Sequence, residues 1–307
     1  MDAPRIVAVV GATATGKTDL GQALAASLGG EVVCADSRQV FRELEVGTGK
    51  PAPADRAARP HHLFDALGLG DRPSAGWYAS AAVIACRDIH SRGRTPVLVG
   101  GSGLWLRAAQ HGLSGEPPHD PQVRARLQAE LERDGPEALH ARLVLVDPAT
   151  AARLSPRDRQ RITRALEVHE ASGRPLSWWH GRQGEPAVAG EWRVFELTLT
   201  LHQLDERIAR RTRWMFETGL VEETRALVGA GGEPALRALR AVGYDEALEL
   251  LAGRLTRAEA EERTNLRTRQ LAKRQRTWFR HQVEAVRLEG GGRGAAGPLQ
   301  EALALLG

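Results

Sequence analysis

An eight-residue glycine-containing segment near the N-terminus constrains the fold of this chain more than any other feature. It follows the apolar run 6–10 and precedes leucines spaced four apart at 20, 24 and 28, so it joins a buried strand to a helix. In such a P-loop, backbone N–H groups, the lysine and the positive end of the helix surround a phosphate, and the threonine hydroxyl binds Mg²⁺. The predicted phosphate-binding residues are Gly11, Ala12, Thr13, Ala14, Thr15, Gly16, Lys17 and Thr18, with Thr18 as the metal ligand.

Two further apolar runs predict parallel strands beside this loop. Residues 32–35 end on Asp36, and residues 96–99 end on the sequence Gly-Gly-Ser-Gly at 100–103. Open α/β sheets bind ligands at the carboxyl ends of their strands, so we expect Asp36 to face a second substrate, although an Asp there is also a common helix N-cap. A P-loop NTPase normally has an Asp after a strand such as 96–99. The glycines and Ser102 therefore favour a transferase over a motor or switch NTPase.

Glycine and proline divide the chain into parts. The stretches 112–118 and 172–190 are linkers by composition, and residues 121–171 between them have a helical pattern. Residues 194–199 then alternate as a strand. We expect an α/β class fold: a core with a mainly parallel sheet flanked by helices, built from residues 1–114 and 193–307, and interrupted by a helical insertion at 115–192.

Residues 42–75 contain scattered glycines and prolines and are predicted to be one long loop. The pair His61-His62 in this loop has no further ligand at metal-binding spacing, which favours a structural or substrate-contact role. The stretch 240–244 has no chemistry of its own and is also compatible with a helix end capped by Gly243.

The charge of the chain bears on its partners. The 307 residues carry a formal net charge of +4, and only three of the 42 basic residues are lysines. A GC-rich genome explains an arginine bias by itself, whereas a nucleic acid partner explains it through charge. Clustering favours nucleic acid, because two sets of basic residues are spaced to share one helix face. They are Arg157, Arg161 and Arg164 in the insertion, and Arg269, Lys273, Arg276 and Arg280, beside Trp278 and Phe279, near the C-terminus.

Other classes of protein are disfavoured. Cys34 and Cys86 are the only cysteines, and they match neither a disulfide framework nor a zinc site. No apolar run approaches 18 residues, and the N-terminal apolar run is too short for a signal peptide. The expectation is a soluble cytoplasmic protein with no membrane partner.

The ordered set of motifs resembles the bacterial tRNA dimethylallyltransferase (tRNA isopentenyltransferase) family. The resemblance covers nearly the whole chain and rests on the P-loop together with segments 36–39, 47–51, 60–65, 99–103, 120–124, 160–167, 240–244 and 268–275. Many families share the P-loop, whereas the ordered set is specific. Two departures are small, since Phe41 stands where the family often has Tyr, and Ser102 where Thr is common.

The resemblance implies a monomeric enzyme with a kinase-like P-loop core, which transfers a dimethylallyl group from its diphosphate to N6 of the adenosine 3′-adjacent to the anticodon of tRNA. Asp36 would accept the proton of the amine, and Ser102 would orient Asp36 or the waters of the metal. Lys17, Arg240 and Mg²⁺ near Thr18 would stabilise the departing diphosphate. Positions matching tRNA contacts of the family are Asp36, Ser37, Arg38, Gln39, Ser102, Arg124, Gln160, Arg161, Ile162, Thr163, Arg164, Arg240, Gly243 and Tyr244.

Three alternatives differ from this scheme. An adenylate isopentenyltransferase performs the same chemistry on a free nucleotide, which needs no helical insertion with clustered arginines. A small-molecule kinase would use the P-loop for ATP, but the acidic residue expected after strand 96–99 is missing. A non-catalytic RNA-binding protein would have no use for a phosphate loop.

Overall fold

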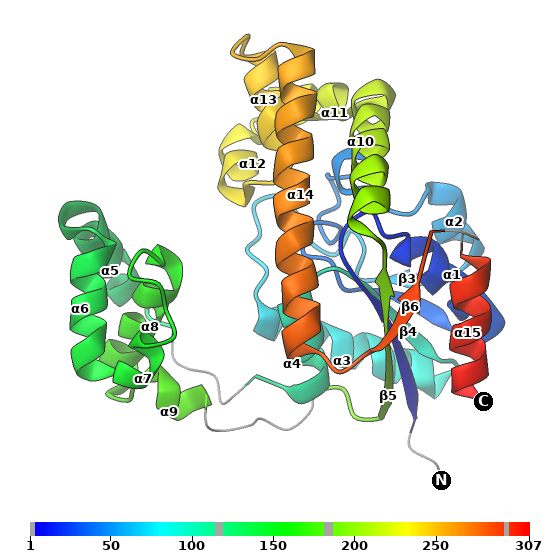
Figure 1. Ribbon diagram of the computed structural model, residues 1–307, viewed down its shortest axis with the longest axis horizontal. Helices are drawn as coiled ribbons and strands as arrows, with labels where there is room; N and C mark the ends of the chain where they lie inside the picture. Colours follow the sequence, from blue (N-terminus) through cyan, green and yellow to red (C-terminus); the bar gives the residue numbers. More distant parts are fainter. Residues whose placement is uncertain (1–3, 114–118, 181–186, 292–294) are drawn as a thin grey trace. The chain divides into compact units, whose positions relative to one another are not determined.

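The computed structural model describes residues 4–113, 119–180, 187–291 and 295–307. They form two compact units, one from residues up to Gln110 together with Ala187 onward, and one from His111–Pro186 (Figure 1). The boundaries expected from composition, at 115 and 192, lie a few residues from this division. Residues 114–118 and 181–186 of the predicted linkers lie outside the described residues.

A parallel sheet organises the first unit. Within the described ranges it has six strands in the order β3-β2-β4-β1-β5-β6, and every pairing is parallel, which confirms the predicted α/β class. Val9 pairs with Val99 on one side and Phe195 on the other, so β1, β4 and β5 end side by side. The strands are β1 (Arg5–Val10), β2 (Glu31–Cys34), β3 (His61–His62), β4 (Pro96–Gly100), β5 (Glu191–Thr198) and β6 (Val286–Glu289).

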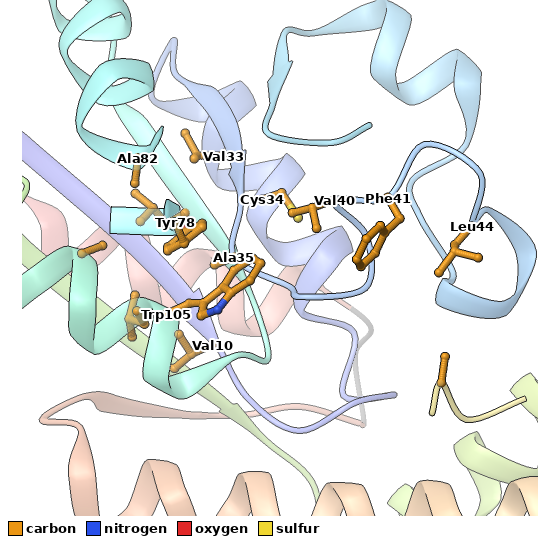
Figure 2. Close-up of a cluster of buried hydrophobic side chains, with 14 of the residues drawn as sticks. Val10, Val33, Cys34, Ala35, Val40, Phe41, Leu44, Tyr78, Ala82 and Trp105 are labelled. Carbon is orange, nitrogen blue, oxygen red and sulfur yellow. The ribbon is translucent and has the colours of Figure 1, made fainter. Parts of the chain in front are cut away.

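Helices cover both faces of this sheet, which is why β1 and β4 are continuous apolar runs. Val7 and Val9 pack with leucines of α1 (Lys17–Ser27) and with α15 (Ala296–Leu306). Ile6, Ala8 and Val10 face the opposite cluster, formed with α3 (Ala75–Ser91) and α4 (Gly103–His111). There the rings of Tyr78 and Trp105 stack with centroids 4.6 Å apart, close to Val10 (Figure 2).

Further helices lie beyond the carboxyl edge of the sheet: α10 (Leu201–Thr218), α11 (Leu220–Gly229), α12 (Glu233–Leu239), α13 (Tyr244–Leu251) and α14 (Arg257–Gln282). Capping boxes at Thr200 and Thr256 start α10 and α14. These two long helices lie side by side (Figure 1). Ile208 of α10 and Ala272 of α14 pack with Ala12, so both helices cover the P-loop.

The segment 42–75 is more ordered than the sequence predicts. It contains the short 3-10 helix η1 (Val46–Thr48), α2 (Pro53–Ala58) and the edge strand β3. The prediction of one long loop is therefore wrong. Pro53 occupies the first turn of α2, where its missing N–H costs nothing, and β3 is too short to show an alternating pattern.

The second unit is a helical bundle made of α5 (Pro121–Asp134), α6 (Pro136–Val146), α7 (Pro148–Ala151), α8 (Arg159–Ser172) and α9 (Leu176–His180). Its core contains Leu127, Leu143, Ile162 and Leu166. Asp158 caps the N-terminus of α8 through Arg161 N, so Arg157 precedes the helix. The prediction that three arginines share one helix face is therefore wrong for Arg157, which lies outside α8. It holds for Arg161 and Arg164, which lie on this helix.

The chain enters and leaves this bundle at one place in the first unit. Ala109 of α4 lies just before the insertion and Val188 just after it, and Val188 N donates to Ala109 O at 2.9 Å. Among the described residues, every helix is too short or too polar to cross a lipid bilayer.

Candidate active site

The P-loop connects the end of β1 to the first turn of α1. Left-handed backbone at Gly11, Ala14 and Gly16, with φ of 148°, 65° and 94°, curls the loop. A Cβ on Gly11 would lie 2.6 Å from Leu197 O, so glycine is required there. The loop ends at the N-terminus of α1, where unpaired amides and the helix dipole favour an anion.

Lys17 lies inside this loop. Its Nζ donates to Ala12 O at 3.2 Å, and the residue is only 9% exposed. Burial lowers the pKa of Lys17 to about 8, Asp36 acts in the opposite direction, and the positive charge of Arg211 adds to the lowering. Arg211 donates to Thr13 Oγ1 in this loop and to Thr48 O, which also accepts from Gln39 in the Asp36 turn, so hydrogen bonds connect the P-loop to that turn.

Asp36 caps a turn rather than a helix. Its Oδ1 accepts from Arg38 N at 2.9 Å, which holds the carboxylate in one orientation at the end of β2. None of the described residues donates to Oδ2, and the side chain is half-buried. One carboxylate oxygen is therefore available to a substrate.

Ser102 fixes the backbone around Asp36 rather than the carboxylate. Its Oγ accepts from Ser37 N at 2.9 Å, and its own N donates to Ala35 O at 3.1 Å. A Cβ on Gly100 would lie 2.0 Å from Ala35 O, so glycine is needed for this close approach. The glycine at the end of β4 thus has a packing role. It also means that this strand end lacks the carboxylate that a P-loop NTPase would have there.

Arg38 and Gln39 hold neighbouring segments against the site. Arg38 Nη2 donates to Leu239 O at 2.8 Å, and Gln39 Nε2 donates to the carbonyls of Thr48 and Gly49, both at 3.1 Å. The side chains predicted to contact tRNA are thus used within the protein in this structure.

Arg240 terminates α12 in left-handed backbone, with φ of 48°. The residue is exposed, and its guanidinium bonds to none of the described residues. Its neighbour Leu239 accepts from Arg38, so Arg240 belongs to a segment packed against the Asp36 turn. The cap of α12 is therefore Arg240, whereas Gly243 begins the next helix, α13.

Tyr244 is fully buried, and its hydroxyl donates to Glu223. Burial, reinforced by the Glu223 charge, raises the pKa of this phenol. The prediction that the Tyr244 side chain contacts tRNA is wrong, because its ring is buried in the hydrophobic core of the first unit.

Two arginines of α10 cover the P-loop and were missed by the sequence reasoning. Arg207 Nη1 donates to Thr15 O at 2.9 Å, and Arg211 donates to Thr13 Oγ1 at 3.2 Å and to Thr48 O at 2.8 Å. Burial lowers the pKa of Arg211, while Asp36 opposes that shift. Their spacing of four residues was a signal, but it was hidden among other arginines of the same helix.

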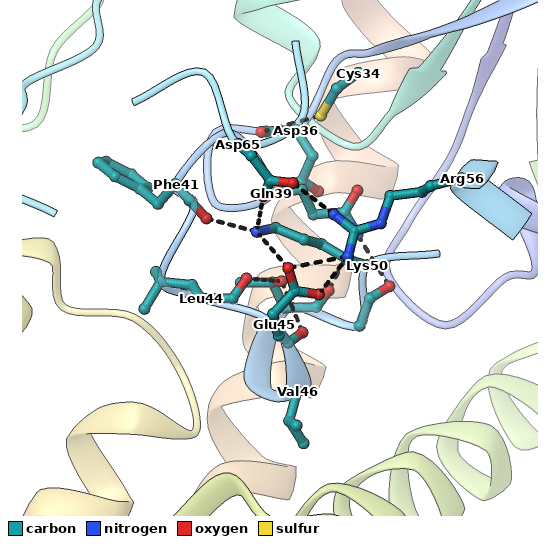
Figure 3. A network of polar contacts seen from close by, with 12 residues as sticks. Cys34, Asp36, Gln39, Phe41, Leu44, Glu45, Val46, Lys50, Arg56 and Asp65 are labelled. Atoms are coloured by element: carbon teal, nitrogen blue, oxygen red, sulfur yellow. Dashed lines mark hydrogen bonds and ion pairs between the residues drawn. The ribbon is translucent and has the colours of Figure 1, made fainter. Parts of the chain in front are cut away.

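A charge network centred on the buried Lys50 supports the site from the side of η1 (Figure 3). Lys50 Nζ, with no exposed side-chain surface, donates to Phe41 O at 2.6 Å, Asp65 at 2.5 Å and Glu45 at 3.3 Å. Arg56 pairs with the same two carboxylates. The network ties residues 41–65 together and so fixes the turn whose carbonyls hold Gln39 and Arg211.

The adjacent histidines make protein contacts. His62 Nε2 lies 2.6 Å from Glu31, and His61 Nδ1 lies 2.8 Å from Arg59 O. Across residues 4–113, 119–180, 187–291 and 295–307, no three His, Cys, Asp or Glu side chains are grouped to hold a metal. Both histidines thus have the contacts of structural residues.

A buried carboxylate organises the basic residues of the bundle. Glu167 is fully buried and lies 2.7 Å from Arg124, 3.2 Å from Arg164 and 2.5 Å from His119. Gln160 and Arg161 are exposed on α8, and Arg161 pairs with Asp158 at 2.5 Å.

Two further residues of α8 were predicted to contact RNA. Ile162 packs in the bundle core, and Thr163 donates to Arg159 O at 2.7 Å. Since both are buried, the expectation that their side chains touch RNA is corrected.

The basic residues of α14 are divided between solvent and protein contacts. Lys273 and Arg280 are exposed, and Arg269 lies 3.2 Å from Asp205. The neighbouring aromatics belong to the core, because Phe279 is buried and Trp278 packs against the same cluster. Trp278 and Phe279 are therefore not surface contacts for RNA, whereas Lys273 and Arg280 are available to it.

Comparison with known proteins places this site in a family. The model of the IPP transferase family matches residues 39–282, and that of the isopentenyl transferase family matches residues 4–61. The chain belongs to the IPP transferase family. The resemblance inferred from the ordered motifs is thereby confirmed.

Relatives within the IPP transferase family are similar over nearly their full length. The tRNA dimethylallyltransferase of Halorhodospira halophila is 47% identical over 94% of this chain and 93% of its own. That of Sorangium cellulosum is 45% identical over 91% of this chain and 89% of its own. The crystal structure of the tRNA isopentenylpyrophosphate transferase from Bacillus halodurans matches with a TM-score of 0.71 and 32% identity, covering 98% of this chain and 95% of that one.

Proposed function

We propose that this member of the IPP transferase family transfers the dimethylallyl group of dimethylallyl diphosphate to N6 of the adenosine 3′-adjacent to the anticodon of tRNA. The observation that supports the proposal is the set of hydrogen bonds that connects the P-loop, which contains Lys17, to the turn that carries Asp36. A P-loop that holds a diphosphate thus lies beside a carboxylate with an available oxygen. The names and chain-wide similarity of the relatives support the same reaction.

The leaving group of this reaction is pyrophosphate, whose negative charge increases as the allylic C–O bond breaks. The P-loop amides, Lys17, Arg207 and Arg211 are arranged around the loop before substrate binds, so they stabilise that charge without reorganising. Arg240 is the further cation assigned by the family resemblance, and its exposed guanidinium is available to the substrate.

Asp36 is the proposed general base. The lone pair of the adenine amine is delocalised into the ring, so the amine becomes a nucleophile for the allylic carbon only as it loses a proton. The proton passes from N6 to Oδ2 of Asp36, while Oδ1 stays bonded to Arg38 N. Ser102 contributes by fixing Ser37, the next residue.

The donor set fits Mg²⁺ held mainly by substrate. Thr18, in the first turn of α1, supplies a hydroxyl beside the phosphate loop, and Mg²⁺ prefers to keep several waters and to bind phosphate oxygens. The lack of a metal-ligating cluster among the described residues agrees with that mode. When bound, the ion would neutralise part of the diphosphate charge.

We assign tRNA binding to the helical bundle, residues 111–186, and to the charged face of α14. Arg124 and Arg164, oriented by Glu167, and the exposed Gln160 and Arg161 are the proposed contacts of the bundle. A free nucleotide would need no such surface, so the bundle favours tRNA over AMP as the acceptor.

One labelling experiment tests this assignment. The protein is incubated with Mg²⁺ and radiolabelled dimethylallyl diphosphate together with either tRNA or AMP, with Asp36→Asn as the control. Label in tRNA alone supports the proposal. Label in AMP indicates an adenylate isopentenyltransferase, and label in neither acceptor contradicts prenyl transfer to adenine.

A further inference from the structure

The side-chain amide of Gln275 joins two loops of the site that are far apart in the sequence. Its Oε1 accepts from Thr13 N in the P-loop at 2.9 Å, and its Nε2 donates to Gly101 O after β4 at 3.0 Å. If the amide were flipped, its NH₂ would face the N–H of Thr13 and its oxygen would face Gly101 O, and neither pair could form a hydrogen bond. The two partners therefore fix the orientation of the amide.

The surroundings are shaped for this bridge. A Cβ on Gly101 would lie 2.4 Å from Gln275 Nε2, so glycine leaves the space that the amide occupies. Helix α14 is anchored on both sides of Gln275, because Ala272 and Phe279 are buried. A Cβ on Gly103 would lie 2.1 Å from the ring of Trp278, so the absence of a side chain at Gly103 lets Trp278 pack closely there. The amide is therefore presented by a rigid element.

The P-loop has a physical need for such support. Ala14 adopts left-handed backbone, which is unfavourable for a residue with a Cβ and persists only where its surroundings hold it. The preceding residue, Thr13, is held at its N–H by Gln275 and at its Oγ1 by Arg211. The bridge thus fixes the loop immediately before its strained position.

The other end of the bridge leads to the proposed base. Gly101 is followed by Ser102, which binds Ala35 O through its N and Ser37 N through its Oγ. These two partners flank Asp36. Hydrogen bonds, joined by the peptide link between Gly101 and Ser102, therefore connect the P-loop through Gln275 to the turn that carries the carboxylate.

We propose that Gln275 is a positioning residue for prenyl transfer, which sets the distance between the phosphate loop and the Asp36 turn. This inference rests on the proposed function, in which the diphosphate departs toward the P-loop while the amine approaches beside Asp36. Both partners must be aligned on one allylic carbon, and a displacement of about 1 Å can cost about 10²-fold in rate. Gln275 touches neither reacting group and acts through the two loops.

Two substitutions test the bridge. Gln275→Leu keeps the approximate size of the side chain and removes both hydrogen bonds. We expect the single-turnover rate with both substrates saturating to fall about 10- to 100-fold, and the affinity for inorganic pyrophosphate by calorimetry to fall about tenfold. Gln270→Leu is the matched control, because Gln270 is exposed on the same helix, and it should leave both values unchanged.

Gln275→Glu supplies a signature that a general packing defect does not. An ionised carboxylate accepts from Thr13 N but opposes Gly101 O, whereas the protonated acid both accepts and donates as the amide does. The rate of this variant, divided by the wild-type rate at each pH, should therefore rise by about tenfold between pH 8 and pH 5. Dividing by the wild-type rate removes the pH dependence that the two proteins share.

A wild-type rate for Gln275→Leu, or a ratio for Gln275→Glu that does not change with pH, would overturn the proposal. The Gln275→Glu profile keeps the test valid where Gln275→Leu fails to fold. Failure of the proposed function is seen separately, as a wild-type protein that labels no acceptor. Even then, undiminished pyrophosphate binding by a folded Gln275→Leu variant would contradict the bridge.

Discussion

Glu167 accepts a 2.7 Å hydrogen bond from Arg124 although its own side chain is fully buried in the helical bundle. Burial alone would raise the pKa of this carboxyl, but its bonds to Arg124 and His119, together with the charge of Arg164, lower it. A lowered pKa in the folded state means that ionisation of Glu167 stabilises the fold above the unfolded pKa of about 4.3, and that this contribution is lost as the pH falls below it.

We expect Glu167→Gln to destabilise the bundle by about 1–3 kcal/mol at pH 7, since the charge-assisted bonds to two arginines weaken. The difference from wild type should shrink as the pH falls below about 4.3 and through the lower pKa of the folded state. Urea denaturation at a series of pH values measures both effects. A difference that does not depend on pH would show that the carboxylate charge contributes nothing to the fold.

Arg157, Arg161 and Arg164 are expected to contact RNA phosphates, although Arg157 lies outside α8. Replacing all three by Ala should weaken tRNA binding and reduce the log–log salt slope by up to about three, while dimethylallyl diphosphate binding is unchanged. Filter binding at several salt concentrations gives the slope. Arg133→Ala is the control, because Arg133 is 70% exposed in the same bundle and pairs with Asp134. An unchanged slope in the triple variant would mean that these arginines contact no RNA phosphate.

Asp36→Asn keeps the shape of the side chain and removes the basic oxygen. Both substrates should still bind, and the single-turnover transfer rate should fall by at least about 10²-fold. The affinity for the diphosphate should hold or improve slightly, because a negative charge near the P-loop is lost. Rapid-quench kinetics with saturating tRNA give the rate, and calorimetry gives the affinity. Near-normal transfer would reduce Asp36 to the cap of a turn.

Arg211 is expected to bind the diphosphate. Its guanidinium contacts Thr13 in the P-loop, so Arg211→Ala should lower the affinity for inorganic pyrophosphate by about 10- to 100-fold, the range for a lost charge-assisted hydrogen bond. Arg213→Ala, at an exposed position of the same helix, should have no effect. Equal affinities for the two variants in calorimetry would place the diphosphate away from Arg211.

Lys17 predicts a pH dependence of anion binding. Its pKa of about 8 in the ligand-free protein leaves it partly neutral above that pH, and a bound diphosphate favours the charged form. The affinity for pyrophosphate should therefore decrease as the pH rises through about 8, with proton uptake on binding. Calorimetry in buffers of different ionisation enthalpy measures that uptake. Lys17→Ala should bind more weakly and without this dependence.

The sequence predicts the sheet and the P-loop well, because local patterns determine both. Residues 6–10, 32–35 and 96–99 are apolar runs of strand length, and Gly11–Thr18 is a motif that carries its own geometry. The position of Asp36 beside the loop follows from the rule that parallel strands end at the same edge. These features needed no knowledge of distant contacts.

The rest of the site depends on contacts between residues far apart in the chain. Arg211 reaches Thr13 across nearly two hundred positions, and Gln275 reaches it across more. The local signal is weak, because the four-residue spacing of Arg207 and Arg211 lies among other arginines of α10, and Gln275 is one of several polar residues of α14. The same holds for Tyr244, whose burial is imposed by Glu223 and the surrounding helices and not by its neighbours in the sequence.

The hydrogen bond from Val188 N to Ala109 O has a consequence for how the chain tolerates change. Because the insertion leaves and rejoins the core at adjacent backbone groups, its length and content impose no strain on the register of β1 and β5. Lengthening, shortening or exchanging the bundle closes a loop whose ends are already tied, at an entropic cost that grows only slowly with loop length. The proposed tRNA-binding surface can therefore change while the P-loop and the Asp36 turn stay in place.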